Sequence, residues 1–137
     1  MNKICILGLG YIGLPTAALF ASHGMQVVGV DISTQIVETL NNGGIHIHEA
    51  GLPELVQAAH ADGRLQICSH PETADAFIIT VPTPFYDDKR ADMRAVTAAS
   101  EAILPHLRKG NLVMLESTSP PRTTTGLVQP ILERSGL

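Results

Sequence analysis

Basic residues, cysteines and long apolar runs are all scarce in this chain of 137 residues. Nine lysines and arginines against 13 acidic residues give a formal net charge of −4, and no basic stripe offsets it. This balance argues against a protein that binds nucleic acid non-specifically. No apolar run approaches the roughly 20 residues of a membrane span, and the N-terminus lacks the basic-then-apolar design of a signal peptide. The composition, 45% hydrophobic and 16% charged, is typical of a soluble globular protein.

The two cysteines, Cys5 and Cys68, both fall within expected buried strands. We interpret them as small core residues of a protein in the reducing cytoplasm rather than as a disulfide. Neither has the exposed, electropositive setting of a reactive thiolate. No internal repeat, low-complexity tract or interdomain linker is visible, so the sequence predicts one domain over residues 1–137.

The most informative segment is KICILGLGYIGLP at residues 3–15. A short apolar run enters a G-x-G-x-x-G turn formed by Gly8, Gly10 and Gly13, and a helical pattern follows it. In a βαβ unit the first glycine makes the tight turn and the second lets backbone approach a pyrophosphate, while the third lets the helix lie close to the sheet. The N–H groups and dipole at the helix N-terminus then face the anion. The alternative is a purely structural glycine turn.

An acidic residue, Asp31, ends the second apolar run (VVGV) and lies 18 residues after Gly13. This spacing is close to the roughly 20 residues of the dinucleotide-binding fingerprint. A carboxylate there accepts hydrogen bonds from both ribose hydroxyls but repels a 2′-phosphate. No arginine follows in DISTQ to neutralise such a phosphate. The sequence therefore predicts NAD, rather than NADP, as the cofactor.

Strand and helix patterns alternate along the whole chain. We expect strands at 4–7, 26–30, 65–69, 76–81 and 111–115, and helices at 12–23, 35–40, 53–61, 93–107 and 123–133. Asp92 is the expected cap of the fourth helix, and Pro130 is expected to kink or shorten the last one. This alternation predicts an α/β doubly wound parallel sheet, a Rossmann fold, with strand order 3-2-1-4-5. No residues remain for a sixth strand, so we expect the domain to be truncated before it.

Ligands of such sheets bind outside the carboxyl ends of the strands. Two further clusters fall there, Val81-Pro82-Thr83-Pro84 and Glu116-Ser117-Thr118. The Thr83 hydroxyl is suited to a ribose or phosphate, although the same residues also fit an ordinary proline-terminated strand. Thr123 and Thr124, further along, are suited either to cap the last helix or to reach the cofactor.

His46 and His48 alternate in IHIHE, a spacing that invites comparison with a metal site. Such a site needs three or four ligands, and nothing nearby supplies the others. We interpret them as surface histidines of a loop. The charged cluster DDKRAD at residues 87–92 indicates a solvated loop before a helix.

The segments GLGYIGLP, VPTP and EST, in this order, resemble the UDP-glucose/GDP-mannose dehydrogenase family. IHIHE and ESTSP look most like its UDP-N-acetyl-D-mannosamine dehydrogenase branch. The resemblance covers the whole chain, but only as the N-terminal cofactor domain of a protein about three times longer. It implies oxidation of the C6 hydroxymethyl group of a nucleotide sugar to a carboxylate in two NAD-dependent steps, through an intermediate held on a cysteine.

By motif match, the resemblance implies NAD contacts from Tyr11, Ile12, Asp31, Thr83 and Thr124. Arg122 departs from the glycine common in relatives at that point. Cys5 and Cys68 match no part of the family's cysteine motif, so we expect this segment to contain no catalytic residue and to be inactive alone. The nucleotide-sugar site would be completed by other domains.

Two alternatives stay open on the sequence: another NAD-dependent dehydrogenase of the 6-phosphogluconate or hydroxyacyl-CoA type, and a free-standing NAD-sensing module. The expected lack of a sixth strand also leaves the fifth as a sheet edge with unpaired backbone groups. We therefore predict self-association through that edge or a frayed C-terminus after about Thr124.

Overall fold

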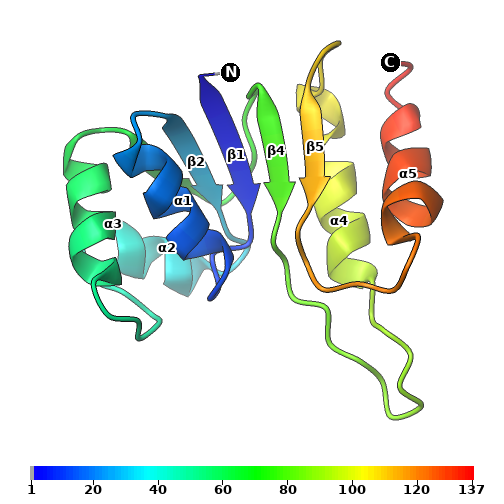
Figure 1. Ribbon diagram of the computed structural model, residues 1–137, viewed down its shortest axis with the longest axis horizontal. Helices are drawn as coiled ribbons and strands as arrows, with labels where there is room; N and C mark the ends of the chain where they lie inside the picture. Colours follow the sequence, from blue (N-terminus) through cyan, green and yellow to red (C-terminus); the bar gives the residue numbers. More distant parts are fainter. Residues whose placement is uncertain (1) are drawn as a thin grey trace.

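The computed structural model describes residues 2–137 and has one parallel sheet of five strands in the order β3-β2-β1-β4-β5 (Figure 1). The strands are β1 (Lys3–Leu7), β2 (Gln26–Val30), β3 (Leu65–Cys68), β4 (Ala76–Ile79) and β5 (Leu112–Leu115). In the central register, Ile6 of β1 lies between Gly29 and Ile78. The predicted fold class and strand order are confirmed.

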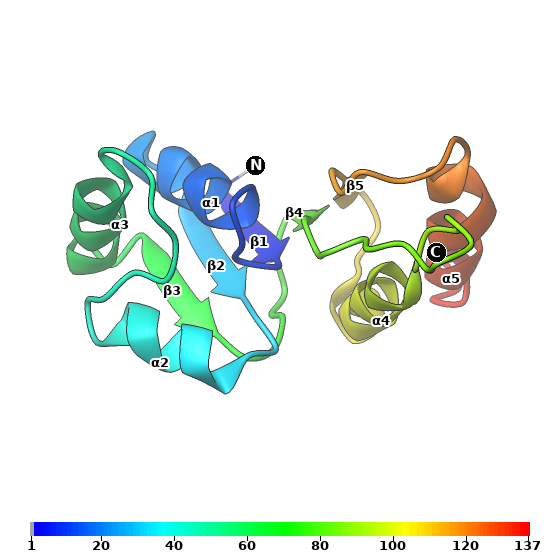
Figure 2. The same cartoon turned by 90° about the horizontal axis from the view of Figure 1, so that it is seen from below.

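Helices cover both faces of the sheet. They are α1 (Gly13–Ser22), α2 (Thr34–Asn41), α3 (Leu52–Ala61), α4 (Arg94–Ile103) and α5 (Gln129–Glu133). Figure 2 shows α1 and α3 on one side of the sheet and α4 on the other, with α2 beside β3 and α5 beyond β5. A 3-10 turn (Leu104–His106) extends α4, and a π-helical turn (Thr124–Val128) precedes α5.

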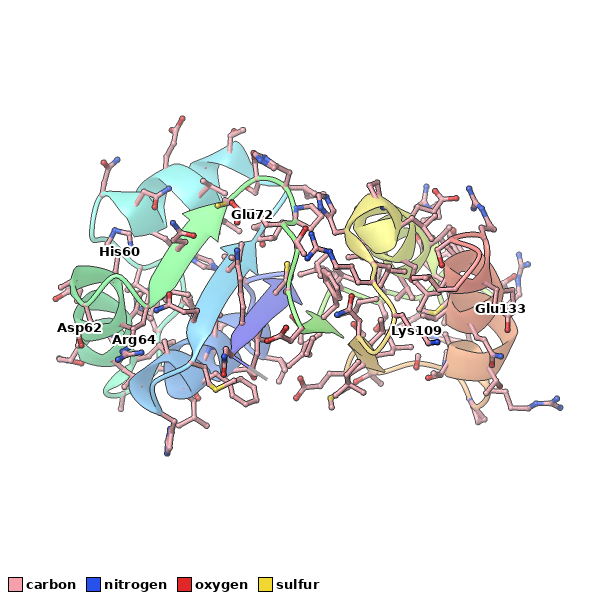
Figure 3. All side chains as sticks on the ribbon, turned by 90° about the horizontal axis from the view of Figure 1, so that it is seen from above. His60, Asp62, Arg64, Glu72, Lys109 and Glu133 are labelled. Carbon is pink, nitrogen blue, oxygen red and sulfur yellow. The ribbon has the colours of Figure 1, made fainter. Side chains whose placement is uncertain are left out.

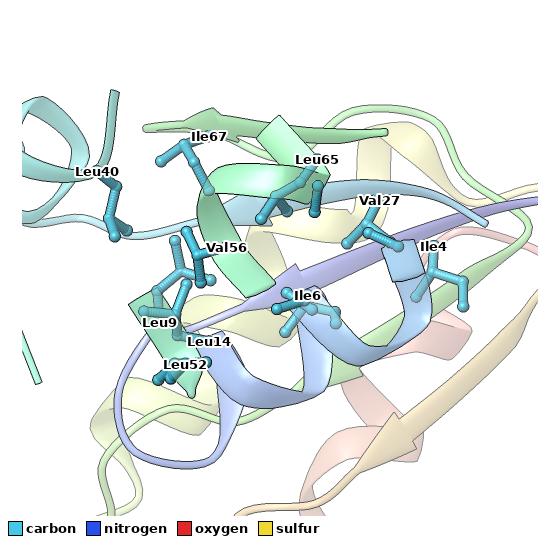
Figure 4. Packing of buried hydrophobic residues seen from close by; sticks show 14 of the residues in the cluster. Ile4, Ile6, Leu9, Leu14, Val27, Leu40, Leu52, Val56, Leu65 and Ile67 are labelled. Carbon is cyan, nitrogen blue, oxygen red and sulfur yellow. The ribbon is translucent and has the colours of Figure 1, made fainter. Parts of the chain in front are cut away.

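Alternate residues of the strands build two separate cores. In β1, Ile4 and Ile6 face the cluster under α1 and α3, whereas Cys5 and Leu7 face the cluster under α4. All four residues of β4 are buried, as expected for a central strand covered on both faces. Figure 4 shows the first cluster, in which Leu9 of the β1–α1 turn lies among side chains of α1 and α3. The turn after β1 is thereby anchored in the core.

Two local expectations need correction. The chain after Thr124 is not frayed, because Val128 and Ile131 are buried. Asp92 is not the helix-capping residue itself, since the cap position of α4 is Met93; its carboxylate still accepts the backbone N–H of Arg94 at 3.0 Å. The expectation for Pro130 is confirmed, because the α-helix expected over 123–133 is shortened to Gln129–Glu133. A π-helical turn lies just before Pro130, which has no N–H to donate to the preceding turn.

The edge of the sheet at which the strands begin and the edge at which they end carry different kinds of residues. At the amino ends of the strands, charged side chains such as Arg64, Glu72 and Lys109 surround the sheet (Figure 3), and Lys3 Nζ donates to Glu72 at 2.8 Å. The candidate site lies at the opposite, carboxyl edge.

Among residues 2–137, no helix has the length and apolar character needed to cross a membrane.

One side of β5 is open. In the described chain β5 pairs only with β4. Leu112 and Met114 lie on the same face as their register partners Ala76 and Ile78, yet are 46% and 44% exposed because α1 and α3 do not extend over them. The expected edge strand is present.

Candidate functional site

The turn between β1 and α1, residues 8–13, begins the candidate site at the carboxyl edge of the sheet (Figure 2). Gly8 has a φ of +97° and donates its N–H to the carbonyl of Val30 at 2.8 Å. A Cβ atom at Gly8 would lie 2.7 Å from the carbonyl oxygen of Thr80. Both the left-handed backbone and the close approach of β4 require glycine here.

The third glycine is even more tightly enclosed. A Cβ atom at Gly13 would lie 1.8 Å from the carbonyl oxygen of Gly8 and 2.5 Å from the Thr80 hydroxyl. Thr80 is buried, and its Oγ1 lies 2.7 Å from the carbonyl oxygen of Gly8 and 3.0 Å from that of Leu7. The sequence had placed Thr80 only as part of a strand. The structure makes it the side chain that fixes the first peptide of the turn.

The amino end of α1 presents free backbone donors. The N–H of Leu14 donates to the carbonyl of Gly10 at 3.1 Å, so helical bonding starts there. Within residues 2–137, the N–H groups of Gly10, Tyr11, Ile12 and Gly13 donate to no protein acceptor. Free N–H groups at the positive end of a helix dipole suit an anion such as a phosphate. A Cβ atom at Gly10 would meet nothing within 4 Å, so space for a ligand lies over the turn.

Asp31, at the end of β2, lies beside this turn. Its Oδ2 accepts the N–H of Leu9 at 2.9 Å and its Oδ1 accepts the N–H of Ser33 at 2.9 Å. Each carboxylate oxygen has about two lone-pair positions, so each retains one for a ligand hydroxyl. The next residue, Ile32, is 94% exposed and offers an apolar surface beside the carboxylate. The sequence pattern did not single out Ile32.

The loops after β4 and β5 are joined to each other. The Thr83 hydroxyl donates to the carbonyl of Thr118, and the Ser117 hydroxyl donates to the carbonyl of Val81 at 2.8 Å. Pro82, between Val81 and Thr83 in the sequence, is exposed. The structure thus brings together the two clusters that the sequence placed at strand ends.

Thr124 lies further along the chain from these loops. It begins the π-helical turn and lines a groove of about 380 Å³ together with Val113, Leu115 and residues of α5. Its neighbour Thr123 donates its hydroxyl to the carbonyl of Pro120 at 2.7 Å rather than capping the helix. Arg122 has a φ of +71°, a left-handed conformation that glycine adopts with less strain.

The expectation that both histidines lie on the surface is wrong for His46. It is only half-exposed, and its Nε2 lies 2.7 Å from the carbonyl oxygen of Leu9 in the glycine turn. His48 is exposed as expected. In the part of the chain that the structure describes, no three His, Cys, Asp or Glu side chains gather as metal ligands would.

The two cysteines lie on strands separated by β2 and are free thiols. Cys5 is fully buried, and this burial raises its pKa to about 11, so the thiol is protonated at neutral pH. Burial also raises the pKa of Cys68, which is only half-buried rather than a core residue. Neither environment favours a thiolate nucleophile.

Comparison with known proteins shows which family the chain belongs to. The model of the UDP-glucose/GDP-mannose dehydrogenase family, NAD binding domain, matches residues 2–136. The chain belongs to this family. The family match decides against the 6-phosphogluconate and hydroxyacyl-CoA alternatives, and NAD is the cofactor of the matched domain.

Individual relatives within the family are similar over nearly the whole chain. UDP-N-acetyl-D-mannosamine dehydrogenase of Campylobacter jejuni is 53% identical over 133 residues, which are 96% of this chain and 33% of that protein. NDP-N-acetyl-D-galactosaminuronic acid dehydrogenase of Ralstonia nicotianae is 52% identical over 92% of this chain and 30% of its own length. The structure of UDP-N-acetyl-mannosamine dehydrogenase from Staphylococcus aureus superposes with a TM-score of 0.95 at 45% identity, covering 99% of this chain and 34% of that one. The chain thus spans about a third of the length of these relatives.

Proposed function

We propose that the turn of residues 8–13 and Asp31 hold the adenosine diphosphate half of NAD. The free N–H groups of Gly10, Tyr11, Ile12 and Gly13 would donate to the diphosphate oxygens. Gly8 gives the turn its shape, and Asp31 would accept the two hydroxyls of the adenosine ribose on its remaining lone pairs.

Exposed side chains near these groups would cover the adenine base and the outer side of the diphosphate. Tyr11, Ile12 and Ile32 are 65%, 57% and 94% exposed, although they belong to residue types that are usually covered. We propose that Ile32, adjacent to Asp31, contacts the adenine ring. Tyr11 and Ile12 would line the diphosphate on the outer side of the turn.

The nicotinamide half would lie against the joined loops after β4 and β5. Val81, Pro82 and Thr83 form one side and Thr118 the other, and the hydrogen bond from Thr83 to the Thr118 carbonyl holds them together. The Thr83 oxygen keeps its lone pairs to accept from a ribose hydroxyl or an amide. Thr124, at the start of the π-helical turn, would complete this side.

The observation that carries this proposal is the combination of four unpartnered N–H groups with a carboxylate hydrogen-bonded to the same turn. Calorimetric titration of the chain with NAD and NADP tests it. We expect NAD to bind and NADP to bind at least about tenfold more weakly, because Asp31 repels the 2′-phosphate.

Asp31→Ala should weaken NAD binding and reduce the difference in affinity between the two cofactors. Asp62→Ala, an exposed carboxylate at the end of α3, is the matched control. Equal binding of both cofactors by the wild-type chain would contradict the proposal.

For the whole protein we propose an NAD-dependent nucleotide-sugar 6-dehydrogenase in which residues 1–137 are a single cofactor-binding domain. UDP-N-acetyl-D-mannosamine is the proposed substrate, supported by the names of the relatives from Campylobacter jejuni and Staphylococcus aureus. A relative named for N-acetyl-D-galactosaminuronic acid is almost as similar, so its sugar is the second candidate.

We further propose that the reacting cysteine and the sugar-binding groups lie outside these residues. The protonated, buried thiol of Cys5 supports this assignment. The 137-residue chain, mixed with NAD and either nucleotide sugar, should then form no NADH. Absorbance at the NADH band measures the outcome, and sustained NADH formation by this chain would overturn the assignment.

A further inference from the structure

His46 lies in the connection between α2 and α3 and is held there by its neighbours. Ile45 packs against the core under α1 and α3, and Ile47 is part of that core with 4% exposure. The imidazole between them is half-buried. Its Nε2 lies 2.7 Å from the carbonyl oxygen of Leu9, which is 37 residues earlier in the chain. A side chain of a distant loop is therefore bonded to the glycine turn.

The partner atom determines which ring nitrogen carries a proton. A carbonyl oxygen only accepts hydrogen bonds, so Nε2 must be the donor. Among the described residues, the buried Nδ1 of His46 has no hydrogen-bond partner. A proton on Nδ1 would bury a donor without an acceptor, which is costly. The arrangement therefore requires the tautomer with its proton on Nε2.

The Leu9 residue is fixed from three directions. Its side chain is fully buried among Leu14, Leu52 and Val56 (Figure 4). Its N–H donates to Asp31 and its carbonyl accepts from His46. The carbonyl of Leu9 and the N–H of Gly10 belong to one planar trans peptide, in which the two groups have opposite directions. Fixing the carbonyl on His46 therefore fixes the direction of the Gly10 N–H, the first unpartnered donor of the turn.

We propose that His46 is a positioning residue of the NAD site, whose Nε2–H holds the Leu9–Gly10 peptide so that the Gly10 N–H faces the bound diphosphate. This inference rests on the proposed binding of the diphosphate at residues 10–13. His46 itself contacts no part of the cofactor in this arrangement; it acts through one backbone peptide.

Three variants of the chain test the inference by calorimetric titration with NAD. His46→Ala removes the donor, and we expect NAD to bind about tenfold more weakly, as is typical for loss of one hydrogen bond. His46→Gln places an amide N–H donor at a similar reach, and its affinity should return to within about threefold of the wild type. His48→Ala changes an exposed histidine of the same loop and should leave the affinity unchanged.

A measurement on the ligand-free chain separates positioning from loss of stability. Nitrogen NMR of the imidazole should show a proton on Nε2 and none on Nδ1 in His46. The backbone amide resonance of Gly10 should shift in His46→Ala, whereas that of Gly63, at the far end of α3, should not. A stability effect alone would leave the Gly10 resonance of the folded chain in place.

The outcomes are distinct. A His46→Ala chain that binds NAD as tightly as the wild type, an unmoved Gly10 resonance, or a proton on Nδ1 in place of Nε2 would overturn the inference. If the wild-type chain binds no NAD, the proposed function fails, while the imidazole and Gly10 measurements still decide whether His46 fixes the peptide.

Discussion

The hydroxyl of Thr80 lies 2.7 Å from the carbonyl oxygen of Gly8, so a buried side chain at the end of β4 holds the turn that follows β1. Thr80→Val keeps the shape of the side chain but leaves this carbonyl without its donor. We expect the free energy of unfolding to fall by about 1–2 kcal/mol, the usual cost of an unsatisfied buried polar group. NAD affinity should fall as well, because the turn loses a restraint.

Urea unfolding and NAD titration measure both effects. Thr80→Ser keeps the hydroxyl and is the matched control, with a smaller change in each quantity. A Thr80→Val chain as stable as the wild type would show that the hydroxyl does not restrain the turn.

A methyl group at Gly13 is expected to disrupt the fold. Its Cβ would lie 1.8 Å from the carbonyl oxygen of Gly8, a backbone atom that cannot move without displacing the turn. We expect Gly13→Ala to lower the free energy of unfolding by about 3 kcal/mol or more, in the range of severe overpacking. Thermal unfolding measures the change, and a Gly13→Ala chain with an unchanged melting temperature would contradict the described packing.

A methyl group at Gly10 is expected to act on binding instead. Its Cβ would meet no protein atom within 4 Å, so stability should stay within about 0.5–1 kcal/mol of the wild type. The same methyl group would occupy the space proposed for the diphosphate, so NAD affinity should fall at least about tenfold. Titration of the folded variant with NAD decides this, and unchanged affinity would place the diphosphate elsewhere.

Stability should decrease at high pH because of Cys5. Burial raises the pKa of this thiol from 9.0 to about 11. Between these two values the unfolded chain loses a proton that the folded chain keeps, so the free energy of unfolding falls as pH rises from 9 towards 11. One pKa unit corresponds to about 1.4 kcal/mol, which sets an upper bound of roughly 2–3 kcal/mol for the loss.

Urea unfolding at pH 8 and pH 10.5 gives this slope. Cys5→Ala should show a smaller decrease than the wild type, although it is less stable overall because of the lost packing. The half-buried Cys68 should matter less, so Cys68→Ala serves as the comparison. Identical slopes for the wild type and Cys5→Ala would contradict the assigned pKa.

Self-association through β5 remains a prediction. In the described chain its outer edge has no strand partner, and Leu112 and Met114 are exposed beside it. An open, apolar edge strand is a template for pairing with another copy. We expect the chain to associate at high concentration and Met114→Lys to reduce this.

Light scattering across a concentration series measures the association. Leu19→Lys changes an exposed apolar side chain of α1 instead and should have little effect. A wild-type chain that stays monomeric at the highest concentrations, or an equal effect of both variants, would contradict pairing through β5.

The sequence predicted the sheet well because most of its strands are apolar runs, and β1, β2 and β5 each end directly before a glycine or an acidic residue. The AFII run of β4 is buried throughout, and the boundaries of β2 agree with the expectation. The turn of residues 8–13 was also predictable, since its glycines are close in sequence and each meets a steric requirement of the βαβ unit. The end of α4 was less predictable, because a 3-10 turn replaces the last helical turn there.

The restraints on the turn could not be predicted from the sequence. Thr80 reads as an ordinary strand residue, and His46 as a loop residue, until the fold brings each to a carbonyl of the turn. Both hydrogen bonds join a side chain to backbone atoms many residues away, and backbone carbonyls carry no residue-specific signal. The clue to His46 was the pair of isoleucines that flank it, which anchor an otherwise polar loop.

The donors assigned to the diphosphate are main-chain amides rather than lysine or arginine side chains. An amide does not titrate between mildly acidic and mildly alkaline pH, and it adds no net charge to a chain whose formal charge is −4. Recognition of the dinucleotide through such groups should therefore vary little with ionic strength, in contrast to phosphate sites built from cationic side chains. It also leaves the side chains at positions 11 and 12 free to differ among relatives without loss of the anion contact.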